Sequence, residues 1–377
     1  AYRHLSRRAE WDHWSFTPRG VNGWPSRFGH LEGIEGIKPK RSLEIFPFTL
    51  GRATLTRAGD DGQSRTDLLG TAGVDVRYGL SSNISLNGTI NPDFGQIDAD
   101  PAVLNLGVFE TFFRERRPFF LEGNQIFETP GPNIAGIAEP TRLYHSRRIG
   151  RQPSRIDLPD DSDEVDRPDN TTILGAVKVS GKTESRTAFG ILNAVTGSEF
   201  AHIDQRLTDA QTGVVDTLRR RHKVEPTTNY FVGRVQQDAL NNSTVGAQIT
   251  AVNGETFEPA YVGAGDIHVK WRENAYRVYS RLAVSRAGQD EDRDTGWEGV
   301  LYFSKFSGNF GGQAYLDARS RGFNANDMGF MDRNDRRQAG AHLFYNIQEP
   351  YWFARRSGFN INVWQHNNFA GDNLARG

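Results

Sequence analysis

Apolar and polar residues alternate with a period of two along most of the chain from about residue 41 onward. Residues 245–251 and 359–363 are clear examples, because apolar side chains occupy every second position there. Such alternation is typical of strands that bury only one face. It predicts thirteen strands, near residues 41–57, 70–79, 82–91, 171–181, 186–196, 224–237, 243–253, 259–272, 275–287, 295–305, 309–319, 338–348 and 357–369.

The lengths of the predicted connections distinguish a barrel from a soluble sandwich, which would also alternate. Tight turns, such as 79–81 and 182–185, alternate along the chain with longer loops, such as 92–170, 197–223 and 320–337. Short turns on one rim and long loops on the other are typical of outer-membrane barrels. The fold class predicted is therefore all-β: an antiparallel, up-and-down transmembrane β-barrel that is incomplete in this chain and carries one long inserted segment.

The order of the connections also orients the predicted barrel. The first connection is a long one, so the first strand should run outward and residues 1–40 should form a periplasmic linker. Residues 41–377 then form a partial barrel, with 92–170 as a plug or an extracellular cap. Single-chain bacterial barrels have even strand numbers, because both ends return to the periplasm. Thirteen strands therefore lead us to expect a fragment whose parent chain adds an odd number of strands.

The two faces of the predicted strands differ in character. The apolar face, expected to contact lipid, includes Val76, Ile84, Ile249, Val269, Leu316, Leu343 and Ile361. The other face carries charges of both signs, and a Lys or Arg in the bilayer centre costs about 2–4 kcal/mol. We therefore predict that this face lines a polar lumen, with the candidates Arg77, Asn87, Lys178, Gln248, Asp266, His268, Lys270, Arg277, Arg281, Gln313, Asp317, Arg319 and His342. Aromatic residues near the strand ends suit interfacial girdles, although a soluble fold could place them similarly.

Composition excludes several other classes of protein. No stretch approaches the roughly 18 consecutive apolar residues of a spanning helix. Cysteine is absent, which excludes disulfides and thiolate metal sites. The 45 basic and 46 acidic residues nearly cancel, so no global field draws the chain toward nucleic acid. No P-loop, dinucleotide fingerprint, Gly-x-Ser-x-Gly turn or paired zinc-binding histidines occur, and no cofactor is predicted.

The longest connection holds the most distinctive sequence of the chain. Residues 91–101 read NPDFGQIDADP and residues 109–123 read FETFFRERRPFFLEG. The residues that define these stretches are Asn91, Pro92, Asp93, Phe94, Asp98, Asp100, Phe112, Phe113, Arg117, Pro118, Phe119, Phe120, Glu122 and Gly123. Together they resemble the signature of the DUF5916 family, and stretches such as 144–150, 224–230 and 326–330 are also similar to it.

This resemblance covers nearly the whole chain and implies a large β-barrel protein of the bacterial outer membrane. Members of the family often carry a carbohydrate-binding, family-9-like domain ahead of the barrel. That domain has no residues in this chain, so the resemblance alone assigns no carbohydrate site here.

The inserted segment allows several interpretations. Apolar residues between 103 and 113 are spaced for a short amphipathic helix that ends at Pro118. The segment could fold into the lumen as a plug, which we prefer, or lie outside as an extracellular cap. Asp93, Asp98 and Asp100 are weak calcium candidates, since their spacing lacks a closing Glu and Asx turns or salt bridges fit as well. The acidic run 160–166 is interpreted as a solvated loop without fixed structure.

Three hypotheses about function follow. The preferred one is a non-enzymatic outer-membrane barrel that passes or binds a polar solute, for which a saccharide is one candidate. The alternatives are a surface hydrolase that acts on polysaccharide through loop carboxylates, and a structural or assembly protein of the outer membrane. The expected partners are the lipid bilayer, a polar small molecule or saccharide, and an upstream periplasmic domain of the parent chain. Nucleic acid is not expected as a partner.

Overall fold

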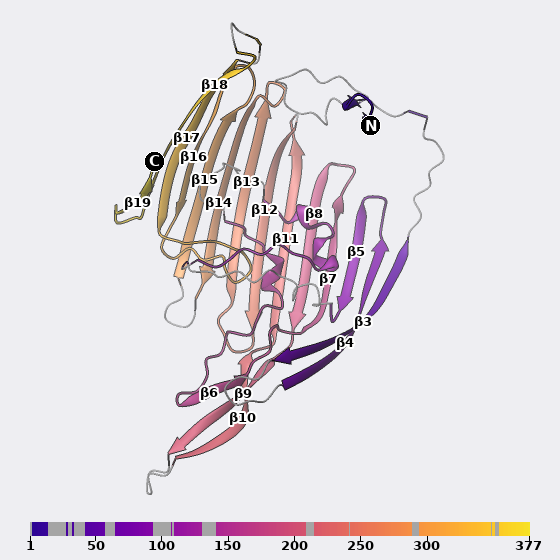
Figure 1. Cartoon of the computed structure of the whole chain (residues 1–377), viewed down its shortest axis with the longest axis vertical. Coiled ribbons are helices and arrows are strands. Elements are labelled where there is room, and N and C mark those ends of the chain that lie inside the picture. Colours follow the sequence, from indigo (N-terminus) through magenta and orange to yellow (C-terminus); the bar gives the residue numbers. More distant parts are fainter. Residues whose placement is uncertain are drawn as a thin grey trace.

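The computed structural model describes residues 2–13, 28, 32–33, 42–56, 65–92, 107, 109–129, 141–208, 215–240, 242–288, 294–347, 349–350 and 354–377. Within these ranges nearly all regular structure is β, and one antiparallel sheet of fourteen strands dominates the fold (Figure 1). The three short helices of the described ranges fall far below the length and apolar character of a membrane-spanning helix.

The fourteen strands of the sheet lie side by side in the order in which they occur along the chain. They are β3 (Leu43–Thr56), β4 (Arg65–Gly79), β5 (Ile84–Ile90), β7 (Ile173–Lys182), β8 (Thr187–Thr196), β11 (Thr228–Ala239), β12 (Ser243–Gly254), β13 (Ala260–Trp271), β14 (Tyr276–Ala287), β15 (Asp294–Lys305), β16 (Phe310–Arg319), β17 (Arg336–Ile347), β18 (Ser357–Asn367) and β19 (Asn373–Arg376). This up-and-down order confirms the predicted antiparallel, all-β fold. Within the described ranges the sheet is open, with β3 and β19 as its two edges.

Each of the thirteen predicted strands overlaps one of the strands from β3 to β18. The fourteenth, β19, was not predicted, because its four residues NLAR show no alternation. The turns β4–β5, β7–β8, β13–β14 and β15–β16 lie at one end of the sheet, which we call the short-turn end. The connections β5–β7, β8–β11 and β16–β17 lie at the opposite, long-loop end.

A smaller sheet extends from the long-loop end, where the sequence predicted only loops (Figure 1). It has the order β10–β9–β6, with β6 at Ser162–Asp166, β9 at Glu199–Thr208 and β10 at Val215–Glu225. The acidic run 160–166 therefore contains a strand and is not a loop without fixed structure. Charged side chains pair across this sheet, as Arg219 does with Asp204 at 2.8 Å, so apolar alternation is weak there. Two further strands, β1 (Tyr2–Leu5) and β2 (Glu10–His13), form a separate hairpin.

The inserted segment, residues 92–170, contributes the helices of the fold: α1 (Pro118–Leu121), η2 (Asn124–Ile126) and η3 (Ser146–Arg148). The predicted amphipathic helix ending at Pro118 is wrong for residues 109–117, which are irregular, and α1 instead begins at that proline. Proline is favoured in the first turn of a helix, because its missing N–H would have no partner there. Figure 1 shows these helices lying across the sheet near β7 and β8.

The main apolar core lies between one face of the sheet and the inserted segment. Phe119, Phe120 and Phe127 of the segment pack with Leu192 of β8 and Val232 of β11, and all five side chains are buried. A second cluster joins residues 323–331 of the β16–β17 connection to the same face. One face of the sheet is therefore covered by these segments, and no described segment packs on the other face.

Candidate functional site

The strand registers place all thirteen predicted polar side chains on one face of the sheet. Residues paired directly across neighbouring strands share a face, as do residues two apart on one strand. Arg77 pairs with Asn87, and Asn87 pairs with Lys178. The registers of the following strands place the predicted polar residues of β12, β13, β14, β16 and β17 on this same face. We call this the polar face; it is the face that the inserted segment covers.

The opposite, apolar face carries all seven residues predicted to point outward. Ile249, Leu316, Leu343 and Ile361 are exposed there, although each is a large aliphatic residue. The other three, Val76, Ile84 and Val269, are half-buried. The predicted alternation of faces is confirmed by these positions.

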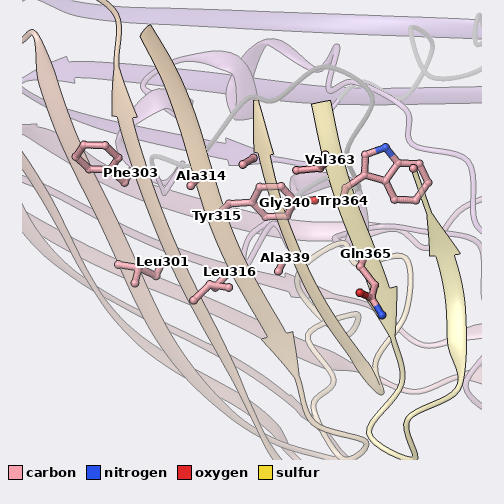
Figure 2. Close-up of a pocket in the computed structure, with 12 residues that line it drawn as sticks. Leu301, Phe303, Ala314, Tyr315, Leu316, Ala339, Gly340, Val363, Trp364 and Gln365 are labelled. Carbon is pink, nitrogen blue, oxygen red and sulfur yellow. The ribbon is translucent and has the colours of Figure 1, made fainter. Parts of the chain in front are cut away.

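A shallow groove of about 610 Å³ lies toward the β19 edge of the sheet (Figure 2). By register most of its lining residues point to the apolar face, among them Leu301, Phe303, Leu316 and Val363. Small residues such as Ala314 form its floor. The groove is lined mostly by apolar side chains and has no charged side chain.

Lys178 of β7 connects the polar face to the inserted segment. Its side chain is buried, and its Nζ donates hydrogen bonds to the carbonyl oxygens of Phe119 and Glu122, the latter at 2.5 Å. The carboxylate of Glu122 forms an ion pair with Arg77 at 2.9 Å. Two predicted lumen residues thus contact two residues of the family motif.

Arg117 holds the motif together from inside. It is buried, forms an ion pair with Glu115 at 2.7 Å, and donates to the carbonyl oxygens of Ser146 and Ile149 at 2.8 Å each. Burial alone would raise the pKa of Glu115, but the hydrogen bonds and charge of Arg117 lower it to about 2. This buried ion pair therefore joins two parts of the inserted segment, residues 115–117 and 146–149.

Arg148 joins the inserted segment to the β16–β17 connection. Its guanidinium bonds both carboxylate oxygens of Glu110 at 2.8 and 2.7 Å and the carbonyl oxygen of Gly329 at 2.8 Å. Beside it Phe112 packs edge-on against Phe330, with ring centroids 5.1 Å apart. Burial and nearby arginines lower the pKa of His145 to about 3, so this imidazole is neutral at ordinary pH.

The long-loop half of the polar face carries a buried network of ion pairs. Arg234 pairs with Asp266 at 2.8 Å, and Glu298 lies between Arg281 and Arg319 at 2.7 and 3.1 Å. The network continues to Asp332 and Arg336 in and after the β16–β17 connection, and Arg281 also bonds Thr129 of the inserted segment at 2.8 Å. The charges in this half of the polar face are therefore neutralised by partners of opposite sign and lie beneath the inserted segment.

Sequence reasoning missed four members of this network: Arg234, Glu298 and Arg336 on strands, and Asp332 in the β16–β17 connection. Each of the three strand residues pairs in register with a predicted polar residue of a neighbouring strand: Arg234 with Gln248, and Glu298 and Arg336 with Arg319. Extending the alternation along β11, β15 and β17 would have found them.

Toward the short-turn end, four polar side chains of β13, β14, β16 and β17 are only half-buried. Lys270, Arg277, Gln313 and His342 all lie there. Gln313 accepts a hydrogen bond from the Tyr302 hydroxyl at 2.5 Å and lies 3.3 Å from the His342 Nδ1. These side chains lie outside the buried ion-pair network.

Two other motif residues, Asn91 and Gly123, have backbone conformations with positive φ. Asn91 has a φ of 50° and donates to Thr71 Oγ1 and the Ala72 carbonyl, both at 2.7 Å. Gly123 has a φ of 65°, and a Cβ there would lie 2.8 Å from Ser180 Oγ, so a larger residue would be strained. Asp93, Phe94, Asp98 and Asp100 lie outside the described residues, and the calcium hypothesis stays untested. The described ranges contain no cluster of three or more potential metal ligands.

Comparison with known proteins gives one match. A family model described as "Domain of unknown function (DUF5916)" matches residues 39–375. A search of curated proteins finds no match.

Proposed function

The chain belongs to the DUF5916 family, and we propose that it forms a β-barrel of the bacterial outer membrane that passes or binds a polar solute. One observation carries this proposal: the large sheet has a bare apolar face and a charged face covered by the inserted segment. A membrane barrel with a polar interior requires that division.

The apolar face suits lipid better than water. Leu282 and Phe359 are each 68% exposed, and large aliphatic side chains are exposed on strand after strand. Soluble monomers rarely expose continuous apolar patches of more than a few hundred Å². In a bilayer the same residues would contact acyl chains, and the patch would be stabilising.

Aromatic side chains gather on the apolar face at the short-turn end. Trp271 stacks on Tyr276 with ring centroids 5.4 Å apart, and Phe310 pairs in register with Tyr345, which pairs with Phe359. Membrane barrels carry such girdles where strands cross the interface between lipid and water. This band supports an interface at the short-turn end.

The proposal requires that the backbone edges of β3 and β19 are paired in the membrane. An unpaired backbone N–H or C=O in hydrocarbon costs several kcal/mol, so spanning sheets close into barrels. Closure, by further strands or by these edges, is therefore part of the proposal.

The inserted segment is proposed to be a plug and not an extracellular cap. Its contacts support this: Lys178 and Arg281 bond it from the middle of strands, and Phe127 packs over Gly190 of β8. A cap would contact loop residues rather than strand interiors.

No observation favours the hydrolase hypothesis. The buried carboxylates of Asp266 and Glu298 are each bonded to arginine guanidinium groups. A carboxylate held in this way is a poor general acid or nucleophile.

Planar-bilayer recording of the purified full-length protein tests the proposal. We expect stepwise conductance increases as barrels insert, together with a heat-modifiable band on gels. A protein that remains monomeric in water and neither inserts nor shifts its migration on heating would contradict the proposal.

A further inference from the structure

The long-loop half of the polar face carries a network of compensated charges, whereas two cations of β13 and β14 near the short-turn end lack carboxylate partners among the described residues. Asp266 is already bound to Arg234 through both carboxylate oxygens, at 2.8 and 3.1 Å. Nearer the short-turn end the same strand carries Lys270, and the next strand carries Arg277. Among the described residues, neither of these two cations forms an ion pair with a carboxylate.

Lys270 and Arg277 are directly opposite each other across β13 and β14. Like charges in that relationship destabilise a sheet. Both side chains are half-buried, so solvent screens their repulsion only in part. The Nε of Arg277 donates to the carbonyl oxygen of Asn274 at 3.4 Å, which leaves its charge uncompensated. Such a pair gains most from an anion that binds between its members.

Neutral hydrogen-bonding groups continue the row that the two cations begin. Arg277 pairs in register with Ser304, Ser304 with Gln313, Gln313 with His342, and His342 with Asn362. Gln313 and His342 are half-buried, so their side chains remain accessible to a solute on this face. The row thus combines two cations, Lys270 and Arg277, with neighbouring side chains that can form hydrogen bonds.

We infer that Lys270 and Arg277 form a subsite for an anionic solute, one that carries a phosphate or carboxylate group. This inference rests on the proposed function and names the class of solute that the barrel would handle. The guanidinium of Arg277 offers a planar fork for two anion oxygens, and the Lys270 ammonium adds a second charge. Gln313 and His342 then bond the polar remainder of the solute. Pores selective for anions use Arg and Lys in the same way.

The test measures binding of inorganic phosphate to the folded full-length protein in detergent micelles by titration calorimetry. Glucuronate, with glucose as its neutral counterpart, shows whether a carboxylate can replace phosphate. We expect saturable binding of an anion, weakened at least fivefold by Lys270→Gln and by Arg277→Gln, and no binding of glucose. Absence of anion binding by the wild-type protein would overturn the inference.

The matched control is Arg272→Gln. Arg272 lies in the same hairpin, but it is exposed and its guanidinium lies 5.7 Å from the ring centroid of Tyr276, a residue of the apolar face. This variant removes one positive charge and should bind phosphate like the wild type. Equal losses in all three variants would show a non-specific charge effect and overturn the inference. Arg277→Lys, which keeps the charge but loses the planar fork, should bind phosphate more tightly than Arg277→Gln and more weakly than the wild type. The heat-modifiable band confirms that each variant folds.

The same protein recorded in planar bilayers separates this inference from the proposed function. Phosphate binding without conductance would contradict the channel but leave the subsite standing. Conductance without phosphate or glucuronate binding would overturn the subsite alone.

Discussion

The ammonium group of Lys178 on β7 lies 2.5 Å from the carbonyl oxygen of Glu122 and also donates to the carbonyl oxygen of Phe119. These carbonyls belong to the C-terminal end of helix α1, where backbone acceptors lack partners within the helix. One buried lysine of the sheet therefore satisfies the end of a helix in the family motif. This contact fixes where the inserted segment meets the polar face.

Lys178→Met should loosen the inserted segment without unfolding the sheet. The variant keeps most of the side-chain volume but leaves two buried carbonyls unsatisfied, at a cost of about 1–3 kcal/mol. We expect roughly tenfold faster hydrogen–deuterium exchange of amides in residues 119–127. Lys182→Met is the matched control, because Lys182 is on the same strand and face but is about half exposed, paired with Asp238. Equal exchange in both variants would show that Lys178 does not hold the segment.

The ion pair between Glu115 and Arg117 should make the inserted segment sensitive to acid. The pKa of Glu115 falls from 4.5 to about 2 on folding, so the carboxylate stabilises the folded state above pH 4.5. That contribution, of order 3 kcal/mol, is lost as the pH falls toward 2.

Urea unfolding at pH 6 and pH 3 checks this prediction. Glu115→Gln should lower the midpoint at pH 6 and remove part of the loss that the wild type suffers at pH 3. A variant with the same pH dependence as the wild type would rule out this carboxylate as the acid-sensitive group.

Glu298→Gln should be strongly destabilising. Glu298 is buried between Arg281 and Arg319, and removing its charge leaves the buried Arg281 without its carboxylate partner, whereas Arg319 keeps Asp332 at 2.6 Å. Breaking a buried pair costs about 3–5 kcal/mol. Glu44→Gln is the control, since Glu44 is on the same face but about 42% exposed and 4.0 Å from Arg77. The temperature at which the folded gel band is lost should fall clearly for the first variant and hardly for the second.

Removal of the inserted segment should open the proposed lumen. Replacing residues 92–170 by a short Gly-Ser linker in the full-length protein is expected to raise single-channel conductance in planar bilayers. Unchanged conductance would favour an extracellular cap over a plug.

The sequence predicted those parts of the fold in which one face of a strand is apolar and the other polar. Alternation along β12 and β18 located both strands and assigned their faces, because the period of two is visible without knowing the neighbours. The strands β6, β9 and β10 escaped prediction, since one face carries paired charges and the other mixes apolar residues such as Ile203 with charged ones such as Arg220, which leaves little apolar signal.

The ion-pair network could not be predicted from spacing alone. Glu298 meets Arg281 and Arg319 because the registers of β14, β15 and β16 bring the three side chains together. Register depends on the whole sheet, whereas alternation is local. The motif likewise identified the family from sequence, but the role of Arg117 within it appears only when Ser146 and Ile149 fold back onto it.

A membrane barrel requires that the apolar face of the sheet contacts lipid, and the absence of cysteine from the chain allows a direct test. Single cysteines replacing Leu316 or Gln313 on β16 carry a nitroxide label in the full-length protein, reconstituted in lipid vesicles. The two positions are on opposite faces of one strand. Relaxation by dissolved oxygen reports lipid, and relaxation by a water-soluble nickel chelate reports water. We predict that the label at 316 responds to oxygen and the label at 313 to the chelate; a label at 316 that responds chiefly to the chelate would contradict the membrane barrel.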